Sequence, residues 1–180
     1  MVFLDETGFL MMPLVRRSWA PRSRTASLYQ RTQSHKKVSV IAVLSVSPGR
    51  DRIRLYFRLH PDANINAPYV LDFLKNLSRQ LKSPMVLLWD LFLAHKAKRV
   101  QSYIRSSKAL HSEFLPPYAP ELNPVENVWG YIKRNPMAHD APYDLLTLAK
   151  KARRHGYSLQ KKLNLLRSFV KHTPLFLRLK

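Results

Sequence analysis

The sequence contains no cysteine, few acidic residues and no long hydrophobic run. Without cysteine there are no disulfides and no thiolate metal sites, so any bound metal must be held by oxygen or imidazole ligands. No stretch reaches the roughly 18 apolar residues that a membrane-spanning helix needs, so we expect no membrane contact. The first ten residues include Asp5 and Glu6 but no basic residue, which argues against a signal peptide.

Positive charge dominates the residues that are present. The 31 Lys and Arg outnumber 11 Asp and Glu among 180 residues, which gives a formal net charge of +20. An excess of this size indicates a polyanionic partner such as nucleic acid, and a ribosomal or simply basic protein is the alternative. The hydrophobic fraction of 46% is typical of a globular domain. The length fits one domain with a core of its own.

Apolar runs predict the strands of a sheet. Val2-Phe3-Leu4 indicates a buried strand that ends at Asp5. Residues 38–46 are rich in β-branched side chains and predict a central strand. Residues 53–59 alternate apolar and polar side chains, which predicts a half-buried strand antiparallel to its predecessor across a turn at 48–51. The remaining expected strands are residues 85–89, a buried and parallel strand followed by Asp90, and residues 110–115.

Helical spacing of apolar residues predicts five helices. The first follows Asn66, an expected N-cap, and runs to Leu81. Another opens at Asn123, with Pro124 at the first helical position. The other expected helices span residues 95–106, about 143–154 and 158–171. This order of elements predicts an α/β fold with a mixed sheet flanked by helices, and the C-terminal helices belong to the same domain.

Three carboxylates stand where catalytic groups gather in such folds. Asp5 and Asp90 each follow a buried apolar strand, and Glu126 lies in the first turn of a helix after a proline-rich connector. Three carboxylates brought together repel one another unless a cation lies between them. Mg²⁺ and Mn²⁺ prefer oxygen ligands, so the set suits a divalent metal site. Two such ions would serve phosphodiester chemistry.

Each carboxylate also has a structural alternative. Asp5 and Asp90 suit turns or caps at strand ends, and Glu126 with Asn123 resembles a helix capping box. Glu6 and Glu121 are neighbouring alternatives to Asp5 and Glu126. Only the combination of the three favours the metal site.

Three segments resemble the DDE transposases of bacterial insertion sequences, in the branch related to the mariner elements. Residues 3–9 (FLDETGF) resemble the first acidic motif of that family, and residues 87–90 (LLWD), with His95 five positions after Asp90, resemble the second. Residues 115–129 (LPPYAPELNPVENVW) resemble the third, and 35 residues separate Asp90 from Glu126, close to the spacing of the family. Residues 17–24 are similar to the segment after the family's first strand.

The resemblance implies a ribonuclease H-like catalytic domain over residues 1–180, with Asp5, Asp90 and Glu126 as catalytic metal ligands. It implies Mg²⁺ or Mn²⁺, two ions, as the cofactor. The implied activity is DNA strand cleavage and transfer of the 3′-hydroxyl to target DNA. The implied partners are transposon ends, target DNA and further copies of the chain on DNA. The corresponding location is the bacterial cytoplasm, in association with the nucleoid.

Three departures from the family qualify the activity. Leu91 stands where Asn is common and cannot hydrogen-bond a metal-bound water, and Ser23 stands where Gly is usual. The helix-turn-helix domains that precede the first strand in full-length relatives are expected to be absent. The chain is then a second half with a separately encoded N-terminal DNA-binding partner, a shortened chain, or an impaired remnant that only binds DNA. A ribonuclease H acting on RNA is a further, weaker hypothesis.

His95 and Asn123 are candidate auxiliary residues. His95 lies beside the acids and would orient a phosphate or a water, with a purely structural role as the alternative. Backbone contacts by Arg and Lys dominate DNA affinity. The expected DNA-binding residues are Arg16, Arg17, Arg22, Arg24, Lys96, Lys133 and Arg134.

Overall fold

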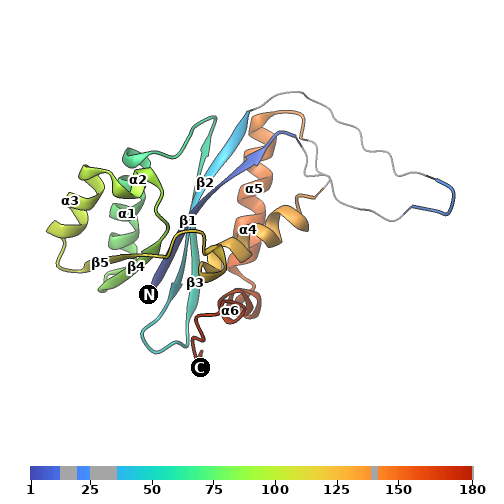
Figure 1. Cartoon of the computed structure of the whole chain (residues 1–180). Coiled ribbons are helices and arrows are strands. Elements are labelled where there is room, and N and C mark those ends of the chain that lie inside the picture. The colour runs from blue at the N-terminus through green and yellow to red at the C-terminus, as the bar shows by residue number, and fades with distance from the viewer. Residues whose placement is uncertain (13–19, 25–35, 139–141, 180) are drawn as a thin grey trace.

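A five-stranded mixed sheet forms the centre of the protein in the computed structural model (Figure 1). The structure describes residues 1–12, 20–24, 36–138 and 142–179. The strand order is β3-β2-β1-β4-β5. The strands are β1 (Val2–Leu10), β2 (Lys37–Val46), β3 (Ile53–Pro61), β4 (Met85–Trp89) and β5 (Leu110–Phe114).

The pairing directions confirm the predicted mixed sheet. β1 is antiparallel to β2, and β2 is antiparallel to β3. β1 is parallel to β4, and β4 is parallel to β5. The helices are α1 (Ala67–Leu81), α2 (Leu93–Lys96), α3 (Lys98–Ser106), α4 (Pro124–Arg134), α5 (Leu145–Gln160) and α6 (Leu163–Lys171). A single 3₁₀ turn, Pro120–Leu122, precedes α4.

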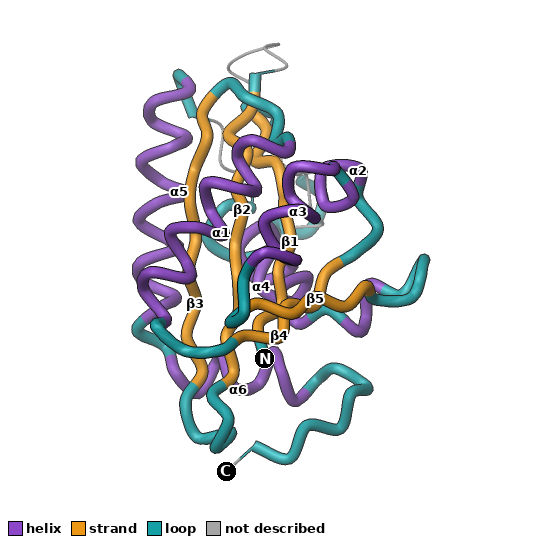
Figure 2. Tube along the Cα trace, turned by 90° about the vertical axis from the view of Figure 1, so that its left-hand side faces the viewer, coloured by secondary structure: helices purple, strands orange, loops and turns teal. Residues whose placement is uncertain are grey.

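Helices cover both faces of the sheet and enclose two hydrophobic cores. One core joins the sheet to α4, α5 and α6 and includes Phe3, Leu44 and Trp129. The other joins the opposite face to α1 and α3 and includes Leu4 and Trp89. Phe3 and Leu4 are adjacent on β1, so the alternation of the strand sends one side chain into each core. Figure 2 shows α5 beside β3 on one side of the molecule and β5 on the other.

β1 is longer than the sequence analysis predicted, and this changes the position of Asp5. The prediction that the strand ends at Asp5 is wrong, because β1 continues to Leu10 along β2. What ends near Asp5 is the pairing with β4, for which the last matched residues are Phe3 and Leu88. Asp5 therefore lies where β1 separates from its parallel neighbour, and a space opens at this point between the two strands.

One expected helix is divided in the structure, and the predicted cap of another is confirmed. The expected helix 95–106 is divided at Ala97, whose ψ of 134° is extended, into α2 and α3. The side chain of Gln101 donates to the carbonyl of His95 at 2.7 Å and replaces the missing helical hydrogen bond. Asn66 caps α1 as predicted, with its side chain accepting from Tyr69 N at 3.3 Å.

The boundaries of the two C-terminal helices differ from the prediction, except that α6 ends at residue 171 as expected. Asp144 caps α5 by accepting from Thr147 N at 2.6 Å, and α5 continues to Gln160. The predicted second helix started at Ser158, but α6 starts at Leu163, whose side chain is exposed rather than inward.

Gly156 lies where α5 packs closely against β3. A Cβ at this position would lie 2.4 Å from the ring of Phe57 on β3, so glycine is required for the close approach of helix and sheet. No helix in the described ranges is long and apolar enough to cross a membrane.

Candidate active site

The three predicted carboxylates line one pocket. Asp5 comes from β1, Asp90 follows β4, and Glu126 lies in the first turn of α4. Asn123 and the connector 115–120 complete the wall. We call this cavity the carboxylate pocket. Residues separated by up to 121 positions in the sequence thus meet at the carboxyl end of β4, where α/β sheets gather functional groups.

Asp5 is buried and its charge is unfavourable in the metal-free protein. Its side chain points toward α4, and its Oδ2 accepts a hydrogen bond from Trp129 Nε1 at 2.8 Å. Burial, followed by repulsion from Glu126 and Glu6, raises the pKa of Asp5 to about 8, although the hydrogen bond from Trp129 opposes this rise. A carboxyl group kept in this state is stabilised in its ionised form by any cation that enters the pocket.

Asp90 is held by hydrogen bonds from His95 and from the backbone of Phe92. Its Oδ1 accepts from Phe92 N at 3.0 Å and lies 2.9 Å from His95 Nδ1. The hydrogen bond from His95, the largest cause, lowers the pKa of Asp90, and the bond from Phe92 N acts in the same direction. Asp90 is therefore ionised where Asp5 resists ionisation.

Glu126 owes its position to the start of α4. Pro124 occupies the first turn, and Asn123 caps the helix by accepting from Val125 N at 3.1 Å. In a capping box, the Glu126 side chain would accept from Asn123 N, but that group donates to Pro120 O at 3.0 Å. The exposed Glu126 carboxylate is thus available to the pocket.

Asn123 ties α4 to β1 directly beside Asp5. Its side chain is buried, and its Nδ2 donates to the carbonyl of Leu4 at 3.0 Å. One amide therefore caps the helix that carries Glu126 and bonds the strand that carries Asp5. This contact gives Asn123 a positioning role that the spacing of the sequence did not specify.

The neighbouring acids Glu6 and Glu121 do not line the carboxylate pocket. Glu6 follows Asp5 on the strand and turns to the opposite face, where its Oε1 lies 3.0 Å from His95 Nε2. Glu121 is exposed within the 3₁₀ turn before α4. The geometry thus favours Asp5 and Glu126 over these alternatives as pocket carboxylates.

The pocket fits a hard divalent cation by its chemistry, but its ligands are not preassembled. Among the described residues no three His, Asp or Glu side chains stand close enough together to hold a metal ion. Asp5 is engaged by Trp129 through Oδ2, whereas His95 engages only Oδ1 of Asp90 and leaves its Oδ2 open. The donor set is nevertheless all oxygen, and repulsion from Glu126 and Asp90 contributes to the raised pKa of Asp5. Asp5 would have to turn from Trp129 before it could share an ion with the other two carboxylates.

The structure places two of the predicted DNA-binding residues near the acids, Lys133 beside Glu126 and Asp5 and Lys96 near Asp90. Lys133 is half-buried, and burial lowers its pKa while Glu126 and Asp5 raise it, which places its ammonium near both carboxylates. Lys96 and Arg134 are exposed on α2 and at the end of α4. Arg22 and Arg24 are exposed on a short turn. Arg16 and Arg17 lie outside the described residues.

Ser23 adopts the backbone conformation that its position demands. Its φ is 68°, in the left-handed region that favours glycine, and Arg24 N closes the turn by donating to Pro21 O at 3.0 Å. The glycine that the resembling family uses here would adopt this conformation without strain.

Two contacts were missed by the sequence analysis. Trp129 was noted only as the last residue of the third motif, and Glu6 was considered only as a replacement for Asp5. Trp129 lies three residues after Glu126, one helical turn away, so helical spacing could have placed both on the pocket side. No local signal could have paired Glu6 with His95, 89 residues away.

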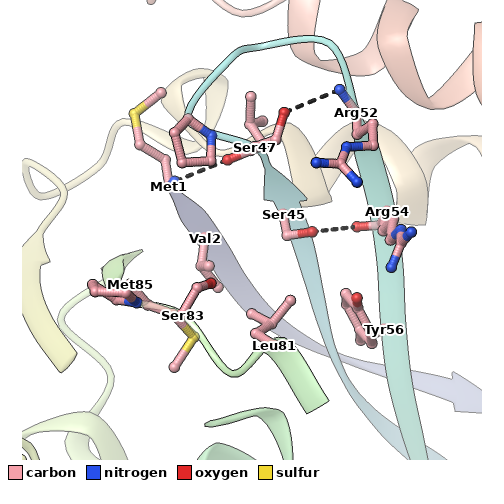
Figure 3. A pocket seen from close by; sticks show the side chains of 13 residues that line it. Met1, Val2, Ser45, Ser47, Arg52, Arg54, Tyr56, Leu81, Ser83 and Met85 are labelled. Atoms are coloured by element: carbon pink, nitrogen blue, oxygen red, sulfur yellow. Dashed lines mark hydrogen bonds between the residues drawn. The ribbon is translucent and has the colours of Figure 1, made fainter. Parts of the chain in front are cut away.

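A second pocket lies at the amino ends of β1 and β4 (Figure 3). Arg52, Arg54, Ser45 and Ser47 contribute to its wall, and we call it the arginine pocket. Figure 3 shows Arg52 N bonded to Ser47 Oγ, at 3.0 Å, and Ser45 Oγ bonded to the carbonyl of Arg54, at 3.4 Å. The lining residues include no Asp or Glu, so this pocket offers no carboxylate ligand for a metal.

Solved structures with the same fold are transposases. A mariner Mos1 paired-end complex with Mg has a TM-score of 0.67 and 19% sequence identity, and the alignment covers 95% of this chain and 52% of that chain. A Mos1 paired-end complex with the left transposon end has a TM-score of 0.65 and 17% sequence identity, and the alignment covers 96% of this chain and 55% of that chain. The catalytic domain of Mos1 mariner transposase has a TM-score of 0.56 and 14% sequence identity, and the alignment covers 94% of this chain and 80% of that chain. The chain thus spans about half the length of the first two structures.

The sheet and the helices that flank it define a ribonuclease H-like fold. The sequence profile of the family described as DDE superfamily endonuclease matches residues 1–146. This match covers most of the chain, so the protein belongs to the DDE superfamily of endonucleases. None of the curated proteins matches the chain.

Proposed function

We propose that the chain is the catalytic domain of a transposase, which cleaves DNA strands and joins them to target DNA. The observation that carries this proposal is the convergence of Asp5, Asp90 and Glu126 on one pocket in a member of this endonuclease family. The net charge of +20 supports a DNA substrate, because a polyanion must approach an otherwise repulsive acidic centre.

Asp5, Asp90 and Glu126 would hold Mg²⁺ or Mn²⁺, with two ions in the working site. Bound ions of this kind activate the attacking oxygen and stabilise the leaving oxygen of a phosphodiester. Two further residues support the three metal ligands. Asn123 fixes the distance between β1 and α4, and Trp129 restrains the Asp5 carboxylate until the site is loaded.

The basic residues would bind the DNA backbone. Lys133, whose ammonium interacts with Glu126 and Asp5, would meet the phosphate at the cleaved bond, and Arg22, Arg24, Lys96 and Arg134 would contact other phosphates. Arg16 and Arg17 extend this expectation to residues that the structure does not describe. One similar structure is a Mos1 paired-end complex with the left transposon end, which supports transposon ends and target DNA as partners of this chain. Assembly of several copies on DNA and a separate N-terminal DNA-binding half belong to the same proposal.

A plasmid-nicking assay tests the proposal. Purified chain should nick supercoiled DNA with Mg²⁺ or Mn²⁺, and chelation should stop the reaction. Glu126→Gln keeps the size of the side chain but removes its charge, so nicking should be lost. Glu121→Gln, an exposed acid outside the pocket, is the matched control and should nick like the unsubstituted chain. Nicking that persists after chelation or in Glu126→Gln would contradict the proposal.

The alternative is an impaired remnant that binds DNA without cutting it. Leu91 favours it, because this apolar side chain lines the carboxylate pocket next to Asp90. Leu91→Asn should raise the nicking rate several-fold, since an amide can hydrogen-bond a metal-bound water. Robust nicking by the unsubstituted chain, lost in Glu126→Gln, would eliminate the alternative. The absence of nicking by both the unsubstituted chain and Leu91→Asn would favour the impaired remnant.

A further inference from the structure

His95 is enclosed on all sides beside the carboxylate pocket. Its side chain has no solvent exposure. The imidazole stacks on Trp89, with ring centroids 4.3 Å apart and planes inclined by 16°. The ring of Phe92 meets it edge-on at 5.5 Å. Packing on two sides, together with the Gln101 bond to the His95 carbonyl, fixes the direction in which both ring nitrogens point.

Both ring nitrogens of His95 face carboxylates. Nδ1 lies 2.9 Å from Asp90 Oδ1 and 3.1 Å from the Asp90 carbonyl. Nε2 lies 3.0 Å from Glu6 Oε1. Because ionised carboxylates only accept hydrogen bonds, both nitrogens donate. The chain Glu6–His95–Asp90 therefore runs from β1 to the residue that follows β4.

This chain restrains a side chain that would otherwise be mobile. The Asp90 side chain is 57% exposed, and rotation about its bonds would move its oxygens through solvent. The bonds from His95 and Phe92 N both end on Oδ1, which leaves Oδ2 as the oxygen for a ligand. A carboxylate oriented in advance loses less freedom when it binds an ion.

Glu6 has no direct access to the carboxylate pocket. Asp5 and Glu6 are neighbours on β1 and point to opposite faces, and Glu6 is absent from the pocket wall. Its side chain is only 13% exposed. A nearly buried carboxylate is costly unless it is paired, and His95 is its partner. Glu6 thus contacts the pocket carboxylates only through the imidazole, although its charge also helps to raise the pKa of Asp5.

We propose that Glu6 and His95 are positioning residues that hold the Asp90 carboxylate in the orientation that binds the divalent cation. Glu6 fixes the imidazole, and the imidazole fixes Asp90. This inference rests on the proposed function, because it assumes that Asp90 is a metal ligand. It assigns to the second acid of the Asp5–Glu6 pair a role that differs from that of the first.

Metal affinity of the full chain, measured by calorimetric titration with Mn²⁺, tests the inference without relying on activity. Glu6→Leu removes the acceptor for Nε2, and we expect Mn²⁺ to bind about 10–100-fold more weakly. Glu6→Gln keeps an oxygen acceptor, so it should restore most of the affinity. His95→Phe keeps the ring against Trp89 but removes both bonds, and it should weaken binding at least as much as Glu6→Leu.

Matched controls separate this inference from the proposed function. His111 and Glu113 form a similar pair, at 2.7 Å, but exposed on β5. Glu113→Leu should leave Mn²⁺ affinity unchanged. Unchanged affinity in Glu6→Leu would overturn the positioning role if Glu126→Gln still abolishes binding. Equal losses in Glu6→Gln and Glu6→Leu would also overturn it, because they would indicate that Glu6 binds the ion directly. Mn²⁺ binding unaffected by Glu126→Gln would instead contradict the proposed function. Should Glu6→Leu not fold, His95→Phe and Glu6→Gln decide the same question.

Discussion

The carboxylate pocket and the arginine pocket lie at opposite ends of the parallel strands β1 and β4, and they differ in what their charges do. Asp5 is buried among like charges, and its pKa rises to about 8. Arg54 is exposed, and Arg52 lies 3.6 Å from the carboxylate of Asp51. The positive charges at the arginine pocket are therefore stabilised by solvent and by an ion pair. Charge at the carboxylate pocket is left unbalanced, as a site that awaits a cation requires.

The largest difference between the pockets should appear in catalysis. Asp90→Asn should lower metal-dependent nicking about a thousandfold, which corresponds to about 4 kcal/mol of transition-state stabilisation, because one metal ligand loses its charge. Arg54→Gln removes a charge of the opposite sign from the arginine pocket and should change the rate by less than about twofold. Single-turnover nicking rates at saturating Mn²⁺ provide the comparison. Similar losses in both variants would mean that general charge, rather than the carboxylate pocket, controls activity.

Stability without metal should change in the opposite direction to activity. Asp5→Asn should stabilise the metal-free chain at pH 7 by on the order of 3 kcal/mol, since the neutral amide avoids the buried charge and its oxygen still accepts from Trp129. The pKa of Asp5 is raised on folding, so the cost of its ionisation is absent below pH 4 and grows as pH rises toward 8. The advantage of Asp5→Asn in urea unfolding should therefore vanish near pH 4. An advantage of the same size at pH 4 and pH 7 would rule out this electrostatic cause.

A core position away from both pockets should affect stability alone. Gly156→Ala would place a Cβ 2.4 Å from the ring of Phe57 and should lower the free energy of unfolding by about 1–3 kcal/mol. Gly130→Ala on α4 is the matched control, because its Cβ would meet no neighbouring atom closer than 3.9 Å. This change should be neutral or slightly stabilising, as alanine favours helix. Mn²⁺ affinity should be unchanged in both variants; a loss of affinity in Gly156→Ala would show that α5 packing also controls the pocket.

The sequence was sufficient to predict the strands, because each is a short apolar run bounded by turn residues. Residues 38–46, 53–59 and 85–89 appear as β2, β3 and β4 with shifts of at most two residues. The full length of β1 was missed, since the part after Asp5 is paired only with β2, and pairing across 27 to 35 positions leaves no local pattern. Gly156 was not singled out in the sequence analysis, although its small size permits α5 to pass close to β3.

The candidate site was predictable to the level of its acids and not to the level of their partners. Asp90 and Glu126 follow local signals, a strand end and a helix start. Trp129 bonds to Asp5 across 124 positions, and Glu6 bonds to His95 across 89. Such contacts depend on how strands and helices pack in three dimensions, and only the fold reveals them. The same holds for Asn123, whose capping role was visible while its bond to the Leu4 carbonyl was not.

The claim that Asp5, Asp90 and Glu126 share a cation is tested most directly by a crystal of the chain soaked in Mn²⁺. The account predicts an anomalous scattering peak in the carboxylate pocket with oxygens of all three side chains as ligands. It also predicts that the Asp5 oxygen turns from Trp129 toward the ion. Saturating Mn²⁺ with no peak in this pocket, or with a peak bound by other residues, would contradict the account.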